Sequence, residues 1–204
     1  MRDEHWNHVY ETKESNAVSW YQSAPATSLR LLQAAGLTTE SCVIDVGGGD
    51  SRLVDTLLEL GLKCVTVLDV SAAAVSRTRQ RLGDRASSVN WLVTDVTGEW
   101  SVPPVDFWHD RAVFHFLTDA TDRRRYVKHL SQSLKPGGFV IIATFALDGP
   151  SRCSGLPVER YSPDSLAAEL GSDFELQRSS IESHQTPMGT NQSFLFAVFR
   201  LIGG

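Results

Sequence analysis

The 204-residue chain has few cysteines and lacks any long apolar run, and each shortage excludes a class of protein. Three cysteines are too few for a disulfide framework, and no cysteine–histidine cluster has zinc-ligand spacing, so we expect no bound metal. No apolar run is long enough to cross a bilayer, and the polar opening MRDEHWNHVYETK lacks the apolar core of a secretory signal. We therefore expect a cytoplasmic protein without a membrane partner.

The three cysteines have different surroundings. Cys42 and Cys64 each open an apolar run, where we expect buried and unreactive thiols. Cys153 lies in a loop rich in glycine, proline and serine and is the one candidate for a reactive thiol. Because it has no clear partner in the sequence, an incidental role is favoured over a nucleophilic one.

Positive charge is also scarce. The chain has 19 lysines and arginines against 24 aspartates and glutamates, which gives a net charge of -5. This balance disfavours a broad contact with a phosphate backbone, so we expect no nucleic-acid partner. Basic clusters at 77–81 and 123–125 lie in helix-like segments and predict solvated helix faces.

Strand-like and helix-like segments alternate along most of the chain, without internal repeats. Strand-like runs cover 41–47, 63–70, 89–96, 104–111 and 139–147, and helical spacing covers 51–61, 71–83, 119–138 and 162–171. Two further strands, 174–184 and 193–201, have no helix between them and must pair antiparallel. The pattern predicts one α/β domain over 1–204. Its doubly wound, mostly parallel seven-stranded sheet carries helices on both faces and ends in an antiparallel hairpin.

The first forty residues precede the first strand. Residues 16–37 indicate one or two helices, which either pack against the domain without a functional role or cover a ligand site. We favour a helical lid over 1–40, because the large side chains of Trp20 and Tyr21 lie close to a break at Pro25.

The stretch VIDVGGGDSR, residues 43–52, places Gly47, Gly48 and Gly49 directly after the first strand. Asp69 and Asp95 follow or close the next two strands, so all three strand ends bring polar groups to one edge of the sheet. Asp69 fits ribose hydroxyls, and Asp95 fits an adenine amino group, because a carboxylate accepts hydrogen bonds. Arg52 stands where a dinucleotide motif would carry its third glycine, which favours a nucleotide ligand without a pyrophosphate.

Five segments together resemble the class I S-adenosylmethionine-dependent methyltransferases, a Rossmann-like family. They are VIDVGGGDSRL, VTVLDVS, WLVTDVT, VDFWHDRAVFHFLTD and LKPGGFVIIATF, and they span 41–147. The terminal hairpin is similar to the inserted antiparallel strand of that fold. The family often has a glycine at the position of Ser51, which here can cap the following helix.

The resemblance implies S-adenosylmethionine as the cofactor and gives the residues their roles. Asp45 to Gly49 would pass under the methionine end, and Asp69 would bind the ribose. The adenine would lie beside Val70 and Ser71, with its edge held by Asp95 and Val96. Asp110 and Arg111 would lie near the methyl group and the acceptor. On this reading, 41–147 form the cofactor-binding half, and 148–204 supply acceptor-side loops and the terminal hairpin.

A sulfonium methyl group is already electrophilic, so the protein must align the acceptor, exclude water and, where needed, remove a proton. The catalytic candidates are Asp110, Arg111 and His115. Asp110 could instead cap a turn, and His115 could equally be a satisfied core histidine between Phe114 and Phe116.

Acceptor-binding candidates come from both ends of the chain. We expect them among Tyr10, Trp20, Tyr21, Arg160, Tyr161, His184 and Gln192. Simple packing is the competing interpretation for the aromatic residues, and a polar turn is the competing one for His184.

We therefore predict a methyltransferase acting on a nitrogen, oxygen or sulfur atom of a small molecule. The segment DFWHDRAVFHFL is partly similar to small-molecule thiol, tellurite and thiopurine methyltransferases. Three alternatives stay open: a protein (lysine-type) methyltransferase, an NAD-dependent oxidoreductase and a non-catalytic cofactor-binding protein. Adenine-N6 DNA methylation is disfavoured, because the Pro-Pro-aromatic motif is missing after the fourth strand. The expected state is a monomer or a homodimer.

Overall fold

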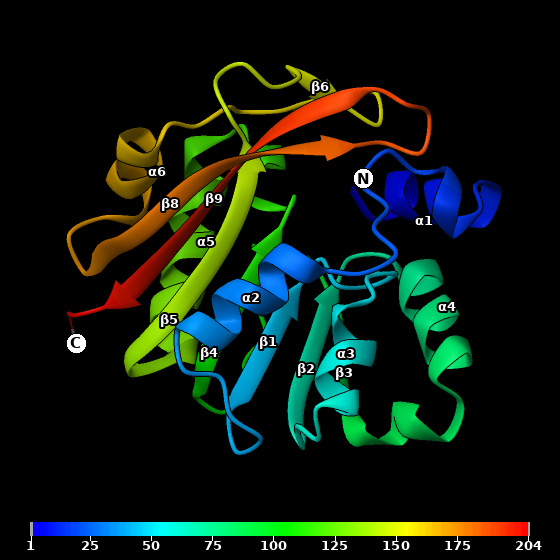
Figure 1. Ribbon diagram of the computed structural model, residues 1–204, viewed down its shortest axis with the longest axis horizontal. Coiled ribbons are helices and arrows are strands. Elements are labelled where there is room, and N and C mark those ends of the chain that lie inside the picture. The colour runs from blue at the N-terminus through cyan, green and yellow to red at the C-terminus, as the bar shows by residue number, and fades with distance from the viewer. Residues whose placement is uncertain (1, 204) are drawn as a thin grey trace.

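The computed structural model describes residues 2–203, and its centre is a seven-stranded mixed sheet (Figure 1). The strand order is β3-β2-β1-β4-β5-β9-β8. The strands are β1 (Cys42–Val46), β2 (Cys64–Asp69), β3 (Val89–Val93), β4 (Val105–Arg111), β5 (Leu134–Phe145), β8 (Phe174–Gln185) and β9 (Asn191–Leu201). Strands β1 to β5 run parallel, whereas β9 pairs antiparallel with both β5 and β8. The doubly wound sheet with its terminal hairpin is confirmed.

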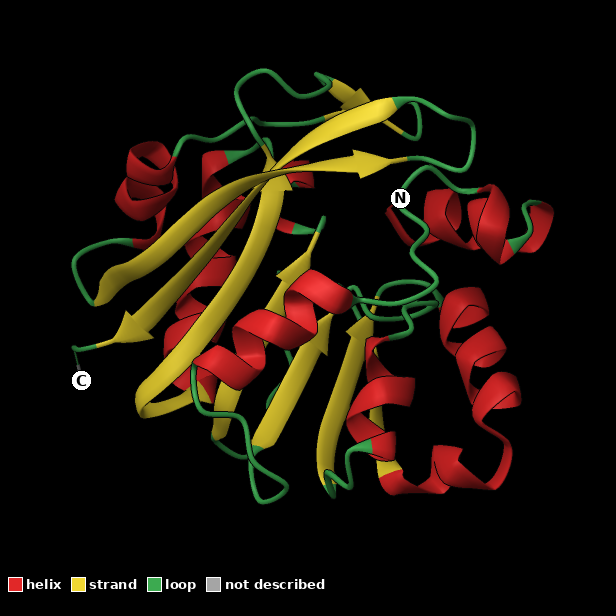
Figure 2. Ribbon diagram, in the orientation of Figure 1, coloured by secondary structure: helices red, strands yellow, loops and turns green. Residues whose placement is uncertain are grey.

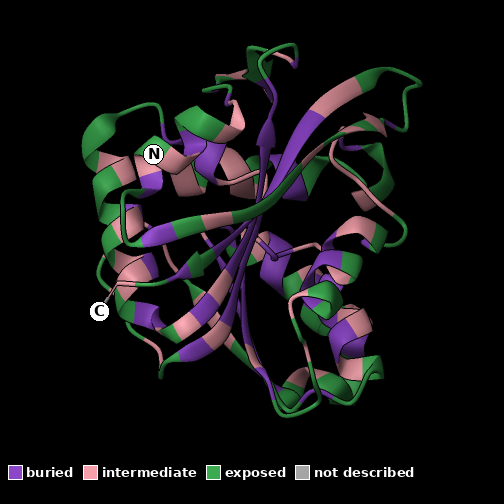
Figure 3. Ribbon diagram, turned by 60° about the vertical axis from the view of Figure 1, so that its left-hand side comes forward, coloured by how far each residue is buried: buried purple, intermediate pink, exposed green. Residues whose placement is uncertain are grey.

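Helices cover both faces of this sheet, as expected (Figure 2). One apolar core joins the sheet to α2 (Ala26–Ala34), α3 (Leu53–Glu59) and the end of α4 (Ala72–Leu82). The other core joins the opposite face to α5 (Ala120–Ser133) and α6 (Pro163–Leu170). Figure 3 shows the buried positions concentrated along the strands between the two helical layers.

Several helix ends follow from local sequence. Ser71 caps α4 by accepting a hydrogen bond from the Ala74 amide, and α4 stops at Gly83. Ser162 begins α6 with a capping box. Helix α5, however, ends at Ser133 and not at 138, and β5 starts directly at Leu134. Pro136 explains the early stop, because proline disfavours helical backbone in the residue before it and cannot continue the hydrogen-bond ladder.

The N-terminal segment differs from the expected arrangement. Residues 2–12 form a helix, α1 (Arg2–Thr12), which the sequence had not indicated, and a short 3₁₀ helix η1 (Ser15–Ala17) follows it. Within 16–37, regular α-helix is confined to α2. In Figure 1, α1 lies near the upper end of α4, on the side of the sheet where the parallel strands end.

The connections at the C-terminal side are more ordered than expected. The two predicted terminal strands leave 185–192 between them, whereas in the structure only 186–190 turn between β8 and β9. Loop 148–162 contains a small hairpin of β6 (Arg152–Cys153) and β7 (Leu156–Pro157). Between β3 and β4, by contrast, residues 94–104 contain no helix.

The cysteine expectation is partly wrong. Cys42 and Cys64 are register partners in β1 and β2, and a disulfide joins them. Cys64 is exposed, and neither residue is a buried free thiol. Cys153 is the free cysteine of the described residues, and it is buried. Within residues 2–203, no helix combines the length and the apolar character that a membrane span requires.

Candidate active site

The turn after β1 is shaped by close approaches that only glycine allows. Gly47 has a φ of 70°, and a β-carbon there would lie 2.1 Å from a Val113 methyl carbon. A β-carbon on Gly48 would lie 2.3 Å from an Asp45 carboxylate oxygen. One on Gly49 would lie 2.6 Å from an Asp69 carboxylate oxygen. The glycines therefore let two buried carboxylates reach the backbone of the turn.

Asp69 ends β2 and holds this turn in place. Its carboxylate accepts hydrogen bonds from the Gly49 amide at 2.9 Å and the Ser71 amide at 2.7 Å. Burial raises the pKa of Asp69 to about 6, although the two amides favour the ionised form and oppose the shift. The remaining lone pairs lie beside a cavity that Asp69 lines together with Gly47 and Val70.

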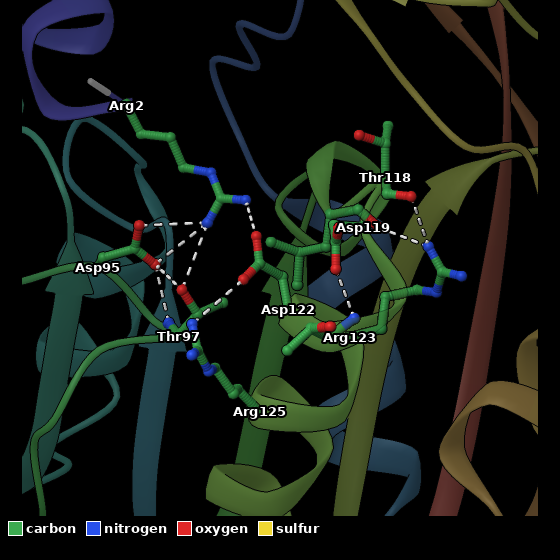
Figure 4. A network of polar contacts seen from close by, with 10 residues as sticks. Arg2, Asp95, Thr97, Thr118, Asp119, Asp122, Arg123 and Arg125 are labelled. Atoms are coloured by element: carbon green, nitrogen blue, oxygen red, sulfur yellow. Dashed lines mark hydrogen bonds and ion pairs between the residues drawn. The ribbon is translucent and has the colours of Figure 1, made fainter.

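Asp95 follows β3 and also lines this cavity, together with Val96. One of its carboxylate oxygens accepts the amide and the hydroxyl of Thr97, at 2.8 and 2.7 Å. Arg2 of α1 forms an ion pair with the other oxygen at 3.2 Å and also pairs with Asp122 of α5 (Figure 4). Burial acts to raise the pKa of Asp95, but the hydrogen bonds from Thr97 and the charge of Arg2 outweigh it and hold this pKa below its ordinary value.

Helix α1 roofs the cavity and is fixed at several points. Arg2, Trp6 and Tyr10 line the cavity from this helix. Asn7 accepts hydrogen bonds from the Ser71 hydroxyl at 2.9 Å and the Ala73 amide at 3.2 Å, which ties α1 to the start of α4. The expected lid is therefore a helix that spans from α4 to α5.

Aromatic side chains fill the space under this roof. The Trp6 ring meets Trp20 and Phe116 edge-on, with centroids 5.6 and 5.1 Å apart. The Trp20 indole N–H donates to the Tyr10 hydroxyl at 3.2 Å. Tyr10 and Trp20, two of the predicted acceptor-binding residues, thus lie at the cavity wall.

A second cavity adjoins the first and lies nearer the end of β1. The two share five lining residues: Tyr10, Trp20, Val46, Gly47 and Arg111. Asp45 and Arg52 line the second cavity, as does Tyr21. Gly48, Gly49 and Ser71 line neither cavity, so their part in the site is to hold the turn and the start of α4.

A buried polar chain in the second cavity was missed in the sequence. His109 Nδ1 lies 2.6 Å from one Asp45 carboxylate oxygen, and its Nε2 lies 2.8 Å from the Ser28 hydroxyl. All three residues are almost fully buried. The other Asp45 oxygen has no hydrogen-bond partner among residues 2–203. Only the alternation of β4, which turns His109 and Arg111 to the same face, could have suggested this role for His109.

Asp110 does not face either cavity, which corrects its expected catalytic and cofactor roles. Its carboxylate accepts hydrogen bonds from the amides of Val113 and Phe114 and, at 2.7 Å, from the Tyr126 hydroxyl of α5. Burial raises its pKa to about 6 in spite of these bonds. Adjacent strand residues point to opposite faces, so Asp110 points toward α5 and Arg111 away from it. The contacts give Asp110 the turn-capping role that was the alternative, and it is not paired with Arg111.

Arg111 lines both cavities. Its Nη1 donates to the Trp20 carbonyl at 2.8 Å, and its guanidinium carbon lies 5.2 Å from the ring centre of Phe194. Burial lowers the pKa of Arg111 to about 10, so the side chain still carries its charge at neutral pH.

His115 is buried beside these residues and lines neither cavity. Its ring stacks on Phe145, and its Nδ1 accepts the Phe145 amide at 3.3 Å. Burial lowers the pKa of His115 to about 3, and Arg111 acts in the same direction. A neutral ring whose Nδ1 accepts this bond carries its proton on Nε2, so its lone pair is not available to act as a base. Nε2 has no hydrogen-bond partner among residues 2–203, so the alternative of a satisfied core histidine holds for Nδ1 and not for Nε2.

The other acceptor candidates are dispersed. His184 donates to the Ser19 carbonyl at 2.8 Å and lies beside Tyr21 in a separate open pocket. Its register partner Gln192 lines neither central cavity. Tyr161 packs on Phe114 under the opposite face. Arg160 donates to the carbonyls of Leu147 and Gly149 at the surface. A further residue, Cys153, lines the first cavity, and burial raises the pKa of its thiol to about 11.

Comparison with known proteins shows what this chain is similar to. Residues 44–140 match a family model described as a methyltransferase domain. Nodulation protein S of Sinorhizobium fredii (strain NBRC 101917 / NGR234) is 29% identical over 137 residues, which are 67% of this chain and 61% of that protein. The chain thus spans about three fifths of the length of this curated relative. Residues 44–140 are thus similar to a methyltransferase domain.

Solved structures share the fold of this chain. The N-methyltransferase NodS from Bradyrhizobium japonicum WM9, in complex with S-adenosyl-L-homocysteine, has a TM-score of 0.73 at 20% identity, over 97% of this chain and 98% of that one. A protein solved in a study of the conversion of a disulfide bond into a thioacetal group during echinomycin biosynthesis has a TM-score of 0.78 at 21% identity, over 98% and 92% of the two chains. Both likenesses extend over nearly the whole chain.

The residues around the two cavities fit S-adenosylmethionine, the cofactor that the resemblance implies. A buried carboxylate at the end of β2 keeps lone pairs for a ribose, and the orphaned Asp45 oxygen suits an amino group. Val70 and Val96 give the first cavity apolar walls for an adenine. Within the described residues, no group of three or more histidine, cysteine or acidic side chains could hold a metal ion.

Proposed function

We propose that this methyltransferase transfers a methyl group from S-adenosylmethionine to a nitrogen, oxygen or sulfur atom of a small molecule. One observation carries the proposal: Asp69, Val70, Asp95 and Val96, from the ends of β2 and β3, meet Gly47 around a single roofed cavity. This arrangement suits an adenosine without a pyrophosphate, which disfavours NAD. The N-methyltransferase named among the similar folds binds the demethylated cofactor, which supports the same assignment.

The cofactor supplies an activated methyl group when it is bound, so the chain's own residues have to position the two reactants and exclude water from them. Asp69 would hold the ribose hydroxyls, and Asp95, already oriented by Thr97, would hold the adenine edge. Asp45, kept in place by His109, would meet the amino group of the methionine tail through its free oxygen. The roof of α1 and the ring of Trp20 would keep water from the reacting atoms.

Neither Asp110 nor His115, the predicted candidates, is placed to act as a general base at the cavity wall. The Asp110 carboxylate points to the other face, and His115 is neutral with its free nitrogen position protonated. We therefore propose alignment and water exclusion as the main catalytic contributions, with an acceptor that is nucleophilic at neutral pH or loses its proton to water.

A small-molecule acceptor fits the enclosed, aromatic-walled cavity better than a protein side chain does, although a lysine-type acceptor is kept as the alternative. The division into a lid (1–40), a cofactor half (41–147) and an acceptor side (148–204) is also part of the proposal. The oligomeric state and the absence of nucleic-acid and membrane partners stay predictions.

Calorimetry and a transfer assay test the function. S-adenosylhomocysteine should bind the purified chain with one site, and NAD should not bind. Labelled S-adenosylmethionine should then pass its methyl group to members of a panel of amines, phenols and thiols. Binding of NAD in place of S-adenosylhomocysteine would overturn the proposal, and label incorporated only into added proteins would favour the protein-acceptor alternative.

A further inference from the structure

Arg111 has a buried charge that forms no ion pair with an acidic side chain of residues 2–203. Its Nε and Nη2 are shielded from solvent and have no hydrogen-bond partner among residues 2–203. Only Nη1 is used, in the bond to the Trp20 carbonyl. Asp45, the acid that acts most on Arg111, is already engaged with His109. A buried cation without a counter-ion is costly, which is why such groups are nearly always paired.

The two free nitrogens form one edge of the guanidinium group. The N–H bonds of Nε and Nη2 point in parallel, in the fork that matches the two oxygens of a carboxylate. Arg111 lines both central cavities, so a molecule held there lies against this side chain. The free donors therefore indicate a planar, two-oxygen anion as their partner.

The position of the guanidinium separates it from the cofactor residues. Those residues belong to β1, β2 and β3, whereas the guanidinium carbon lies 5.2 Å from the ring of Phe194 on β9. Strand β5 lies between β4 and β9, so the Arg111 side chain leans across β5 and away from β1. Arg52 lines the second cavity beside the glycine turn, where the resemblance puts the methionine end of the cofactor.

The remaining groups around Arg111 offer no competing anion. The Cys153 thiol is protonated at neutral pH, because burial raises its pKa, and His115 is neutral. The walls beside it are the rings of Trp20 and Phe116. An apolar or aromatic body with one carboxylate would fill these walls and satisfy the free fork.

We propose that Arg111 binds a carboxylate of the methyl acceptor, so that the acceptors of this methyltransferase are carboxylate-bearing small molecules. The inference rests on the proposed function and narrows its substrate class. The carboxylate anchors the acceptor through the Nε–Nη2 edge, and a different atom of the acceptor, its amine, hydroxyl or thiol, receives the methyl group.

Matched neutral and anionic probes test this without knowledge of the natural acceptor. With S-adenosylhomocysteine bound, benzoate should bind the wild type at least about 10-fold more tightly than benzamide, by calorimetry and by the rise in melting temperature. Arg111→Gln should reduce benzoate affinity by about 10- to 100-fold and leave benzamide unchanged. Arg178→Gln removes an exposed arginine of β8 and should keep the benzoate response. Equal affinities for the two probes in the wild type would overturn the proposal.

A second comparison separates the two possible sources of a carboxylate. S-adenosylhomocysteine and its decarboxylated analogue should each bind Arg111→Gln as they bind the wild type. If the variant instead lost affinity only for the carboxylated compound, Arg111 would be a cofactor residue and the proposal would be wrong. Failure of S-adenosylhomocysteine to bind the wild type would count against the proposed function, and benzoate titration of the free protein would still report on Arg111.

Stability distinguishes a ligand-binding charge from a structural one. Removing an unpaired buried cation should leave the melting temperature of the free Arg111→Gln protein unchanged or raised. Arg111→Lys keeps the charge but lacks the fork, so it should fold and lose most of the preference for benzoate. A strong loss of stability in both variants, with the benzoate preference retained in Arg111→Lys, would show that Arg111 only braces Trp20 and Phe194.

Discussion

Asp69 should make cofactor affinity depend on pH in a range where most carboxylates do not titrate. Burial, and then the charges of Asp45 and Asp50, raise its pKa to about 6 in the free protein, against the two backbone hydrogen bonds. A ribose diol donates hydrogen bonds, and an ionised carboxylate accepts them better than a protonated one. Binding therefore selects the ionised form, and affinity is full above this pKa and falls as the pH drops through about 6.

The magnitude follows from the shift. One pH unit below the pKa, about one molecule in ten carries the ionised carboxylate, so the affinity for S-adenosylhomocysteine should be roughly tenfold lower at about pH 5 than at about pH 7.5. Calorimetric titrations across this range measure the effect directly. Stability should change in the opposite sense. Between pH 3.8 and about pH 6 the Asp69 carboxyl keeps a proton in the folded protein that it releases in the unfolded chain. The contribution of Asp69 to the unfolding free energy therefore decreases as the pH rises through this range.

Two variants identify the group responsible. Asp69→Asn cannot ionise, so its weaker affinity should be flat across the range. Asp110→Asn is the matched control, because the pKa of Asp110 is also raised to about 6 while its carboxylate faces α5 and not the cavity. It should keep the wild-type slope. A wild-type affinity that does not change with pH, or a slope that survives in Asp69→Asn, would refute the assignment of Asp69 to the ribose.

Three further predictions test the roof, the turn and the capping role of Asp110. Arg2→Gln should release S-adenosylhomocysteine about 3- to 10-fold faster than the wild type in stopped-flow tryptophan fluorescence, because both ion pairs between α1 and the rest of the fold are lost. High salt should speed release from the wild type only. Equal release rates for the variant and the wild type would show that α1 does not gate the cavity. Gly47→Ala should lower the unfolding free energy by about 2–4 kcal/mol in urea denaturation, since it adds a clash with Val113 to a positive φ. Gly36→Ala, which has a positive φ but open space around it, should lower the unfolding free energy by about 1 kcal/mol. Equal losses in the two variants would contradict the packing argument. Tyr126→Phe should lower the unfolding free energy by about 1–3 kcal/mol, because the Tyr126 hydroxyl bridges Trp108 and Asp110. Its affinity for S-adenosylhomocysteine should stay unchanged. A large loss of this affinity would return Asp110 to the cofactor site.

The sequence predicted those parts of the fold that depend on local pattern. Apolar runs, glycine breaks and the missing helix before the last strand were enough for the sheet and its hairpin, and Asp69 does end its strand. Helix α1 was not predictable in the same way, because it is polar on most sides and is held by single contacts, such as Asn7 to the start of α4. The disulfide depends on the β1–β2 register, which the sequence does not specify.

The catalytic candidates show the same limit more sharply. Asp110 and Arg111 are adjacent, and a strand turns neighbours to opposite faces, so at most one of them could point to the cavities on the α2 side. Which one does is decided by the long-range contacts of Tyr126 with Asp110 and of Trp20 with Arg111. Sequence reasoning reached the right strand end but assigned both residues to the site.

Acidic side chains and Arg111 lie at different places along this edge of the sheet, which suits methyl transfer from a cationic cofactor to an anionic acceptor. Asp45, Asp69 and Asp95 gather at the ends of β1, β2 and β3, while the Arg111 guanidinium lies near Phe194 of β9 and forms no ion pair with an acid of residues 2–203. A cofactor with a sulfonium cation is stabilised by the acidic side, and an acceptor with a carboxylate is stabilised by Arg111. The field between the two sides would hold each molecule in its own half and orient the acceptor toward the methyl group. Because the product cofactor has lost its positive sulfur, this attraction would weaken after transfer.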